Sequence, residues 1–236
     1  MKIGLIVPPQ NTVNELEWRR MLPPGVDFSL VRIPVHRDTV SPEGKRGLHA
    51  DLRKAIDELA PSKPGVIAYA CTAGSMSLPL DGLTGVMQQM AGVPAVATAP
   101  SLILACRALR LRKIAIATPY HDALNEHEVH FFEECGIKVL NIRGLGIGAG
   151  GPHEYVSLAK VPKEEVYRHA RGTWVPEADG MVVSCTDFAS LEAIPRLEQE
   201  LGKPVISSNT ATLWGALKAG SVKTRVAGFG RLLQEH

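Results

Sequence analysis

Short apolar, β-branched segments alternate along the chain with longer amphipathic segments, and Gly or Pro residues separate many of them. The apolar segments predict strands and the amphipathic ones predict helices. Expected strands are residues 3–7, 27–33, 65–70, 95–97, 113–118, 138–142, 180–184 and 204–206. Expected helices are residues 15–21, 43–59, 78–90, 101–109, 122–135, 163–173, 191–201 and 211–219. This alternation predicts parallel strands with crossover helices on both faces.

The two halves of the chain repeat one another at an offset of about 110 residues, which indicates an internal duplication. Unrelated α/β lobes also share strand-turn patterns, but a Cys-Thr pair recurs at the same place in both halves. We therefore expect an α/β fold with two pseudo-symmetric Rossmann-like lobes. Each would hold a mostly parallel four-stranded sheet flanked by helices, with the active site in the cleft between the lobes. The matched segments are 2–8 with 113–119, 66–72 with 181–186, and 92–96 with 202–206.

This duplication predicts two domains, residues 1–110 and residues 111–236, with room for the C-terminal helix to pack back onto the first. The chain of 236 residues is nearly twice the length of one such lobe. With 45% hydrophobic residues it has enough apolar surface for a core, which excludes a disordered tail protein. A net charge of +2 without a basic stripe argues against nucleic acid as a partner.

The first apolar run is too short for a signal peptide or a membrane span, so we expect a cytoplasmic protein with no membrane partner. Thiols stay reduced in that compartment, which makes disulfides between the four cysteines unexpected. No Cys-x-x-Cys motif is present, and zinc chemistry therefore lacks its usual support.

Distinctive polar residues follow the predicted strands, where open parallel sheets bind their ligands. The same loops open helices, whose free N–H groups bind carboxylates without Lys or Arg. A small anionic substrate fits this pattern better than a nucleotide or a polymer. The loops are residues 8–12, 71–75, 118–120, 185–187 and 207–210.

Cys71 and Cys185 occupy equivalent strand-to-helix turns of the two halves. A helix N-terminus lowers the pKa of a thiol and favours the nucleophilic thiolate. Two thiols across a cleft could act as nucleophile or base and as proton donor on one substrate. Cys106 and Cys135 lie in apolar helical segments and are expected only to pack.

Three segments resemble the maleate cis-trans isomerase group of the aspartate/glutamate racemase superfamily, and the resemblance covers the whole chain. The related arylmalonate decarboxylase is similar to the tail from Leu191 to Leu232, but carries only the second-half cysteine. Both cysteines are present here, which speaks against decarboxylation. The three segments are Pro8-Pro9-Gln10-Asn11-Thr12-Val13-Asn14-Glu15, Ala70-Cys71-Thr72-Ala73-Gly74-Ser75-Met76-Ser77 and Ser207-Ser208-Asn209-Thr210-Ala211-Thr212-Leu213-Trp214.

The resemblance implies an enzyme that needs no cofactor or metal and isomerises maleate to fumarate. Cys71 would add as a thiolate to an alkene carbon and form a succinyl-cysteine adduct, while Cys185 would manage the proton at the neighbouring carbon. Asn11 and Tyr120 match positions that hold substrate carboxylates. Further substrate-binding candidates from the loops are Thr72, Ala73, Thr186, Ser208 and Asn209.

Two positions depart from the isomerase pattern. Asp187 stands where isomerases commonly have Asn, and a carboxylate there could repel a dicarboxylate or prefer a substrate with an amino group. The loop of residues 148–155 lacks an Asn that the family carries, and His153 or Tyr155 could substitute for it.

Some patterns favour plainer interpretations. Residues 146–151 satisfy G-x-G-x-x-G, but Pro152 follows, and a mobile lid is a better interpretation than a dinucleotide site. His127 and His130 lack further metal ligands and are expected on a solvated helix face.

The favoured function is thus an isomerase acting on a small dicarboxylate, most simply maleate. The alternative is a cofactor-independent two-cysteine racemase of an amino acid or related carbon acid, with an arylmalonate-type decarboxylase less favoured. A carboxylate-binding protein without turnover is the third hypothesis. Relatives in the superfamily also lead us to expect a homo-oligomer.

Overall fold

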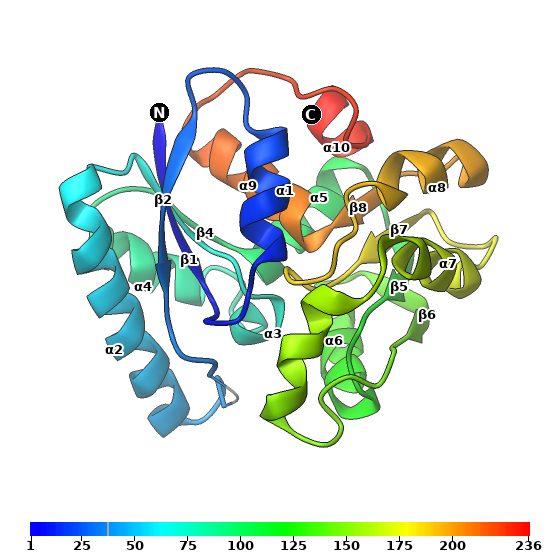
Figure 1. The fold of residues 1–236 in the computed structure, drawn as a ribbon, viewed down its shortest axis with the longest axis horizontal. Helices are drawn as coiled ribbons and strands as arrows, with labels where there is room; N and C mark the ends of the chain where they lie inside the picture. The colour runs from blue at the N-terminus through cyan, green and yellow to red at the C-terminus, as the bar shows by residue number, and fades with distance from the viewer. Residues whose placement is uncertain (37) are drawn as a thin grey trace.

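The computed structural model describes residues 1–36 and 38–236, which form two four-stranded sheets in which every strand pair is parallel. The first sheet has the order β2-β1-β3-β4 and the second the order β6-β5-β7-β8, so the two repeat one topology (Figure 1). The strands are β1 (Lys2–Val7), β2 (Asp27–Arg32), β3 (Val66–Tyr69), β4 (Ala95–Ala97), β5 (Lys113–Ala117), β6 (Lys138–Arg143), β7 (Gly180–Val183) and β8 (Val205–Ser207).

Helices cover both faces of each sheet, as crossover connections between parallel strands require. Figure 1 shows α2 and α4 beside the first sheet, α7 and α8 beside the second, and α5 and α9 in the middle. The helices are α1 (Val13–Met21), α2 (Pro42–Leu59), α3 (Thr72–Ser75), α4 (Gly82–Ala91), α5 (Thr98–Ala108), α6 (Asp122–Glu134), α7 (Lys163–Thr173), α8 (Ala193–Leu201), α9 (Ser208–Ala219) and α10 (Arg231–Glu235), with 3₁₀ segments η1 (Ala60–Ser62) and η2 (Pro152–Lys160). The predicted fold class is confirmed.

Strand β1 shows why these short segments form central strands. Its side chains from Ile3 onward are buried on both faces of the sheet, as a parallel sheet between two helical layers requires. Ile3 and Leu5 pack toward α1 and α9, while Ile6 packs toward Leu52 of α2. The apolar run that predicted the strand is therefore needed on both faces.

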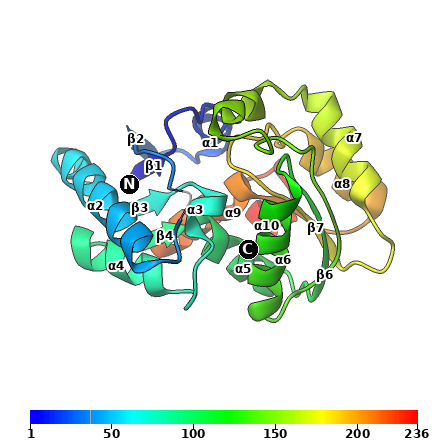
Figure 2. The same ribbon diagram turned by 90° about the horizontal axis from the view of Figure 1, so that it is seen from below.

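The two halves exchange a helix across the middle of the molecule. Helix α5 follows β4 of the first sheet, yet its Ile103 packs with Ile116 and Val182 of the second sheet. Helix α9 follows β8 of the second sheet, yet its Leu213 packs with Leu5 of the first sheet. Figure 2 shows α5, α9 and α10 between the two halves. The division at residues 110 and 111 stays a prediction, and these helices pack across it.

The element boundaries differ from the expected ones mainly at helix starts. Helix α9 begins at Ser208 rather than residue 211, because Ser207 and Thr210 form a capping box directly after β8. Helix α4 begins at Gly82 rather than residue 78. The sequence did not predict the short elements α3, η2 and α10. Within the described residues, no helix is long and apolar enough to cross a membrane.

The crossing of α5 and α9 depends on a small residue. A Cβ atom on Gly215 of α9 would lie 2.8 Å from the Ser101 hydroxyl oxygen on α5. Both positions are buried, so neither the added Cβ atom nor the Ser101 side chain has a free direction in which to move. Close contact between these two helices therefore requires glycine at this position.

We expect Gly215→Leu to lower the free energy of unfolding by about 1–3 kcal/mol, because the added side chain overpacks the α5–α9 contact. Gly85→Ala in α4 is the control, since a Cβ there meets nothing within 4 Å. It should raise the free energy of unfolding by about 0.5–1 kcal/mol through helix propensity. Urea titration measures both. If Gly215→Leu left the free energy of unfolding unchanged, the two helices would pack loosely at this position.

Candidate active site

Both lobe-equivalent cysteines line one cavity of about 450 Å³. It lies at the carboxyl ends of β1, β3, β5 and β7, where the topology of parallel sheets is expected to place a ligand. Residues from both halves of the chain form its wall. They are Pro8, Gln10, Asn11, Val35, His36, Asp38, Thr39, Val40, Cys71, Thr72, Ala73, Tyr120, His121, Ala123, Leu124, His127, Tyr155, Leu158, Cys185, Thr186 and Asp187.

Cys71 is the half-buried residue that caps the N-terminus of α3. Its sulfur accepts a hydrogen bond of 3.3 Å from the Gly74 N–H. Burial raises the pKa of the Cys71 thiol, whereas the Gly74 N–H and the nearby Tyr69 hydroxyl lower it. Both groups would stabilise a thiolate at Cys71.

Gly74 is required by this arrangement. A Cβ atom at residue 74 would lie 3.0 Å from the Cys71 sulfur and would press against the Tyr69 hydroxyl. Sequence reasoning identified neither Tyr69 nor Gly74, although Tyr69 stands only two residues before the cysteine. Both are positioning residues for Cys71.

Cys185 follows β7 with a backbone φ of 103°, a conformation that a side chain disfavours. Its N–H donates to the Ser208 hydroxyl oxygen at 2.9 Å, and its sulfur accepts from the Asp187 N–H at 3.4 Å. Burial, followed by the Asp187 charge, raises the pKa of the Cys185 thiol far above its usual value, while the Tyr120 hydroxyl lowers it. Cys185 is therefore strongly held in its protonated form.

Ser208 joins the two thiol-bearing turns. Its hydroxyl oxygen accepts the N–H of Cys185 and lies 2.9 Å from the hydroxyl oxygen of Thr72, the residue after Cys71. Ser208 itself is fully buried and does not line the cavity. Its observed contacts position both turns.

Asn11 lines the cavity. Its Nδ2 donates to the Thr186 hydroxyl at 2.8 Å and its Oδ1 accepts the Asn14 N–H at 3.1 Å. A carboxamide has two N–H donors, and within the described residues only one of them has a partner. The Thr186 hydroxyl in turn donates to the Ala70 carbonyl at 3.2 Å, which commits it to the protein.

Asn209 lies behind the cavity in a buried polar network. Its Nδ2 donates to Glu17 at 2.7 Å, and its Oδ1 accepts from Asn14 at 2.6 Å. Glu17 also accepts the Leu191 N–H at 2.8 Å, and burial raises the pKa of its carboxyl to about 7. These contacts connect α1 to α9 and to the segment that precedes α8.

Asp187 caps α1 from the opposite half of the molecule. Its Oδ1 accepts the N–H groups of Thr12 and Val13 at 2.9 and 3.1 Å, where the helix dipole favours a negative charge. Burial raises the pKa of its carboxyl to about 6, against the lowering effect of these N–H groups and of Arg32.

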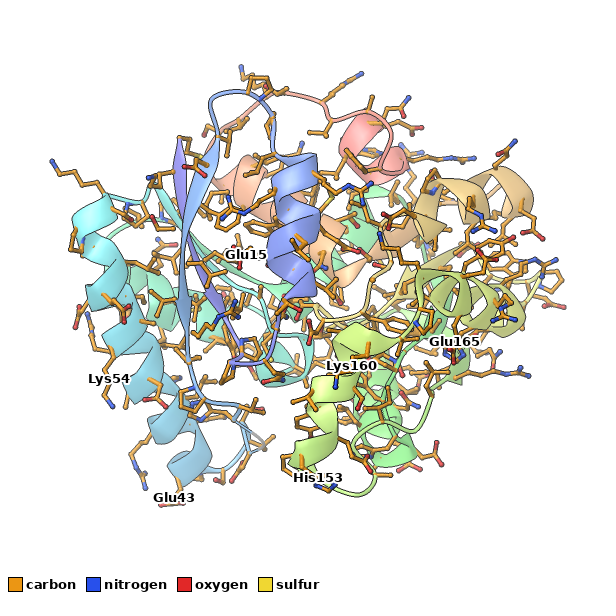
Figure 3. The ribbon with its side chains drawn as sticks, viewed as in Figure 1. Glu15, Glu43, Lys54, His153, Lys160 and Glu165 are labelled. Atoms are coloured by element: carbon orange, nitrogen blue, oxygen red, sulfur yellow. The ribbon has the colours of Figure 1, made fainter. Side chains whose placement is uncertain are left out.

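The outer wall of the cavity comes from the loop before α2 and from η2. Of the two residues expected to replace the missing family Asn, Tyr155 lines the cavity and His153 does not. Figure 3 shows His153 and Lys160 at the two ends of η2. The glycine-rich loop that precedes η2 donates N–H groups of Gly148 and Gly150 to the Glu154 carboxylate, at 2.7 and 3.2 Å.

Two further expectations concern side chains near the site. His127 is half-buried and lines the cavity, whereas His130 on the same helix is exposed. In the part of the chain that is described, no cluster of His, Cys, Asp or Glu has the arrangement of a metal site. Glu15, labelled in Figure 3, lies outside the cavity wall and holds Arg32, which donates to the Asn11 carbonyl.

The cavity brings together all but two of the residues proposed from the sequence. Cys71, Cys185, Asn11, Thr72, Ala73, Tyr120 and Thr186 line it, whereas Ser208 and Asn209 lie behind it. The substrate-binding and catalytic roles of these residues stay predictions. Cys106 is buried in a core cluster and Cys135 packs against that cluster, as expected.

The fold and the site define a duplicated α/β protein in which each half brings one thiol to a common cavity. The chain belongs to the arylmalonate decarboxylase family, whose sequence pattern it matches over residues 3–233. Maleate isomerase of Nocardia farcinica is 32% identical to it over 248 residues, covering 99% of this chain and 96% of the relative. Arylmalonate decarboxylase of Bordetella bronchiseptica is 30% identical over 241 residues, with 99% and 96% covered.

Solved structures of the same group share the fold. A mutant of Nocardia farcinica maleate cis-trans isomerase, described with a covalently bound succinylcysteine intermediate, has a TM-score of 0.84 at 28% identity, covering 100% of this chain and 98% of that one. A cysteine-to-alanine variant of maleate isomerase Iso from Pseudomonas putida S16, solved with maleate, has a TM-score of 0.83 at 28% identity, covering 99% of this chain and 97% of that one. The predicted family resemblance is confirmed, as is the expectation of an enzyme of the isomerase class.

A second buried acid lies behind the site. Glu128 of α6 is fully buried. Within the described residues, neither its two carboxylate oxygens nor the nearby Ser184 hydroxyl has a hydrogen-bond partner. Its charge is close enough to Tyr120 to raise the pKa of that phenol. Burial raises the pKa of Glu128 to about 7, with the Ser184 hydroxyl lowering it.

We expect Glu128→Leu to stabilise the protein more at pH 8 than at pH 5. A carboxyl whose pKa is higher in the folded state stabilises the fold only while protonated, and that contribution is lost as pH rises from its usual pKa through about 7. The gain at pH 8 should be about 2–3 kcal/mol. Thermal unfolding at both pH values measures it, with Glu126→Leu on the exposed face of α6 as control. Equal gains at both pH values would contradict the assignment.

Proposed function

We propose that this chain is a cofactor-independent cis-trans isomerase that converts maleate to fumarate. The observation that carries the proposal is the pair of unequal thiols on one cavity wall. The Gly74 N–H and the Tyr69 hydroxyl near the Cys71 sulfur both lower the pKa of that thiol against the effect of burial. Cys185 has Asp187 beside it, whose charge disfavours the thiolate. Cys71 is thus the nucleophile and Cys185 the proton donor.

The reaction begins when the Cys71 thiolate adds to one alkene carbon of maleate. The alkene electron pair moves to the neighbouring carbon and into its carboxylate, and Cys185 donates its proton to that carbon. The former double bond is now single and rotates. Cys185, as thiolate, then removes a proton from the same carbon, the carbon–sulfur bond breaks, and fumarate leaves with the Cys71 thiolate restored. The Nocardia farcinica relative described with a succinylcysteine supports this sequence.

Negative charge builds on a substrate carboxylate as the thiolate adds, so donors aimed at that carboxylate lower the barrier. The free N–H of Asn11 and the backbone at Thr72 and Ala73, at the start of α3, supply them without a cation. Tyr120 holds Cys185 by its hydroxyl and completes the wall on the opposite side. These roles support an addition mechanism.

Proton NMR with maleate tests the proposal, and we expect fumarate to form. Cys71→Ser and Cys185→Ser should each lower kcat about 10³-fold or more, because each removes a group that acts in the reaction. Cys135→Ser, which lies outside the cavity wall, is the matched control and should retain activity. Mass spectrometry of Cys185→Ser quenched during turnover should find one maleate equivalent on Cys71. An adduct on Cys185 would reverse the two roles.

The same measurement separates the alternatives. In heavy water, a two-cysteine racemase would place deuterium at the α-carbon of an amino acid such as aspartate and form no fumarate. A decarboxylase would release carbon dioxide from an arylmalonate. Either result without fumarate contradicts the isomerase. The expectation of a cytoplasmic homo-oligomer stays a prediction.

A further inference from the structure

Asp187 has one carboxylate oxygen without a partner. While Oδ1 accepts two N–H groups of α1, Oδ2 accepts no hydrogen bond from any residue in the described ranges and is shielded from solvent. The residue is only 2% exposed. A buried carboxylate oxygen without a donor is costly and uncommon. Because Asp187 lines the cavity, a bound substrate could supply the missing donor.

The charged residues of the cavity wall also favour a hydrogen-bond donor over a second substrate carboxylate beside Asp187. Among the described residues of its wall there is no Lys or Arg, while Asp38 and Asp187 are acidic. His36 is bound through its Nε2 to Asp51 at 3.1 Å. One carboxylate of a substrate can use the donors around Asn11 and α3, but a second one beside Asp187 would meet like charge.

Arg32 does not provide the missing compensation. Its guanidinium donates to the carbonyls of Pro8 and Asn11 and to the Glu15 carboxylate, and it is absent from the cavity wall. It lowers the pKa of Asp187 less than burial raises it. Above a pH of about 6 the carboxyl is nonetheless ionised, and an ionised carboxylate only accepts hydrogen bonds.

We propose that Asp187 is a specificity-determining residue that selects a cis-alkenoate with one carboxylate and a hydrogen-bond donor, such as a primary amide, at its other end. The inference rests on the proposed function, since Cys71 still adds to the alkene. The amide N–H donates to Oδ2 of Asp187, and the amide carbonyl keeps the alkene electron-poor. Addition, rotation and elimination then proceed as for maleate, and the amide itself is unchanged.

Competing substrates test the proposal: maleate and the monoamide of maleic acid, each followed by proton NMR to give kcat/KM. The native enzyme should favour the monoamide. Asp187→Asn keeps an Oδ1 that caps α1 but places an N–H donor where Oδ2 was, and the preference should shift toward maleate about 10- to 100-fold. The ratio of the two kcat/KM values does not depend on the fraction of enzyme that is folded.

Asp38→Asn is the matched control. Asp38 also lines the cavity and also uses Oδ1 to accept two backbone N–H groups, those of Val40 and Ser41. Both oxygens of Asp38 have hydrogen-bond partners, because Oδ2 accepts from the Ser41 hydroxyl, so Asp38→Asn should shift the ratio much less than Asp187→Asn does. The inference is overturned if the native enzyme favours maleate and Asp187→Asn leaves the ratio as it was, or if Asp38→Asn shifts it equally. Absence of isomerisation with both substrates overturns the proposed function and this inference together.

Discussion

The hydroxyl of Ser208 contacts both thiol-bearing turns, and the site depends on it. It accepts the N–H of Cys185 and lies beside the hydroxyl of Thr72. Ser208 is also the first residue of α9, the helix that leaves the second sheet and packs on the first. The exchange of helices and the juxtaposition of the thiols are therefore one structural constraint. It also holds Cys185 at a positive φ, which costs on the order of 1–3 kcal/mol.

The duplication places one thiol after the corresponding strand of each sheet, but the two differ in backbone conformation and in their neighbours. Each sulfur has a tyrosine hydroxyl as partner, Tyr69 for Cys71 and Tyr120 for Cys185. Only Cys185 has a carboxylate two residues away, and that carboxylate is fixed by the start of α1 from the other half. One acidic side chain thus makes the two thiols chemically unequal. A mechanism in which one thiol is the nucleophile and the other the proton donor requires this difference.

Local sequence signals predicted much of this architecture. The sequence pattern predicted every strand within a residue or two. It is clearest for the central strands β1, β3 and β7, which are buried on both faces and have no polar side to obscure them. The repeat of Cys-Thr located both thiols at one cavity. The sequence left room for the C-terminal helix to pack on the first lobe. The packing of α5 on the second sheet was not predicted, since an apolar helix such as α5 does not indicate in its sequence which sheet it covers.

Side-chain direction explains the remaining differences within the site. Ser208 and Asn209 follow a strand, as the cavity residues do, but the capping box at Ser207 turns them inward onto Thr72 and Glu17. His127 stands on a polar helix face by sequence, yet that face borders the cavity. Such placement depends on packing between elements far apart in the chain, which a single-sequence pattern does not contain.

The polar network behind the cavity limits how the two halves can move. Separating α1 from α9 would break the hydrogen bonds of Asn209 with Glu17 and Asn14, and would leave buried polar groups unpaired. Removing Asp187 from the start of α1 would leave two N–H groups without an acceptor. These costs hold the two turns at a fixed separation, so in the proposed mechanism the substrate would rotate between thiols that are already positioned.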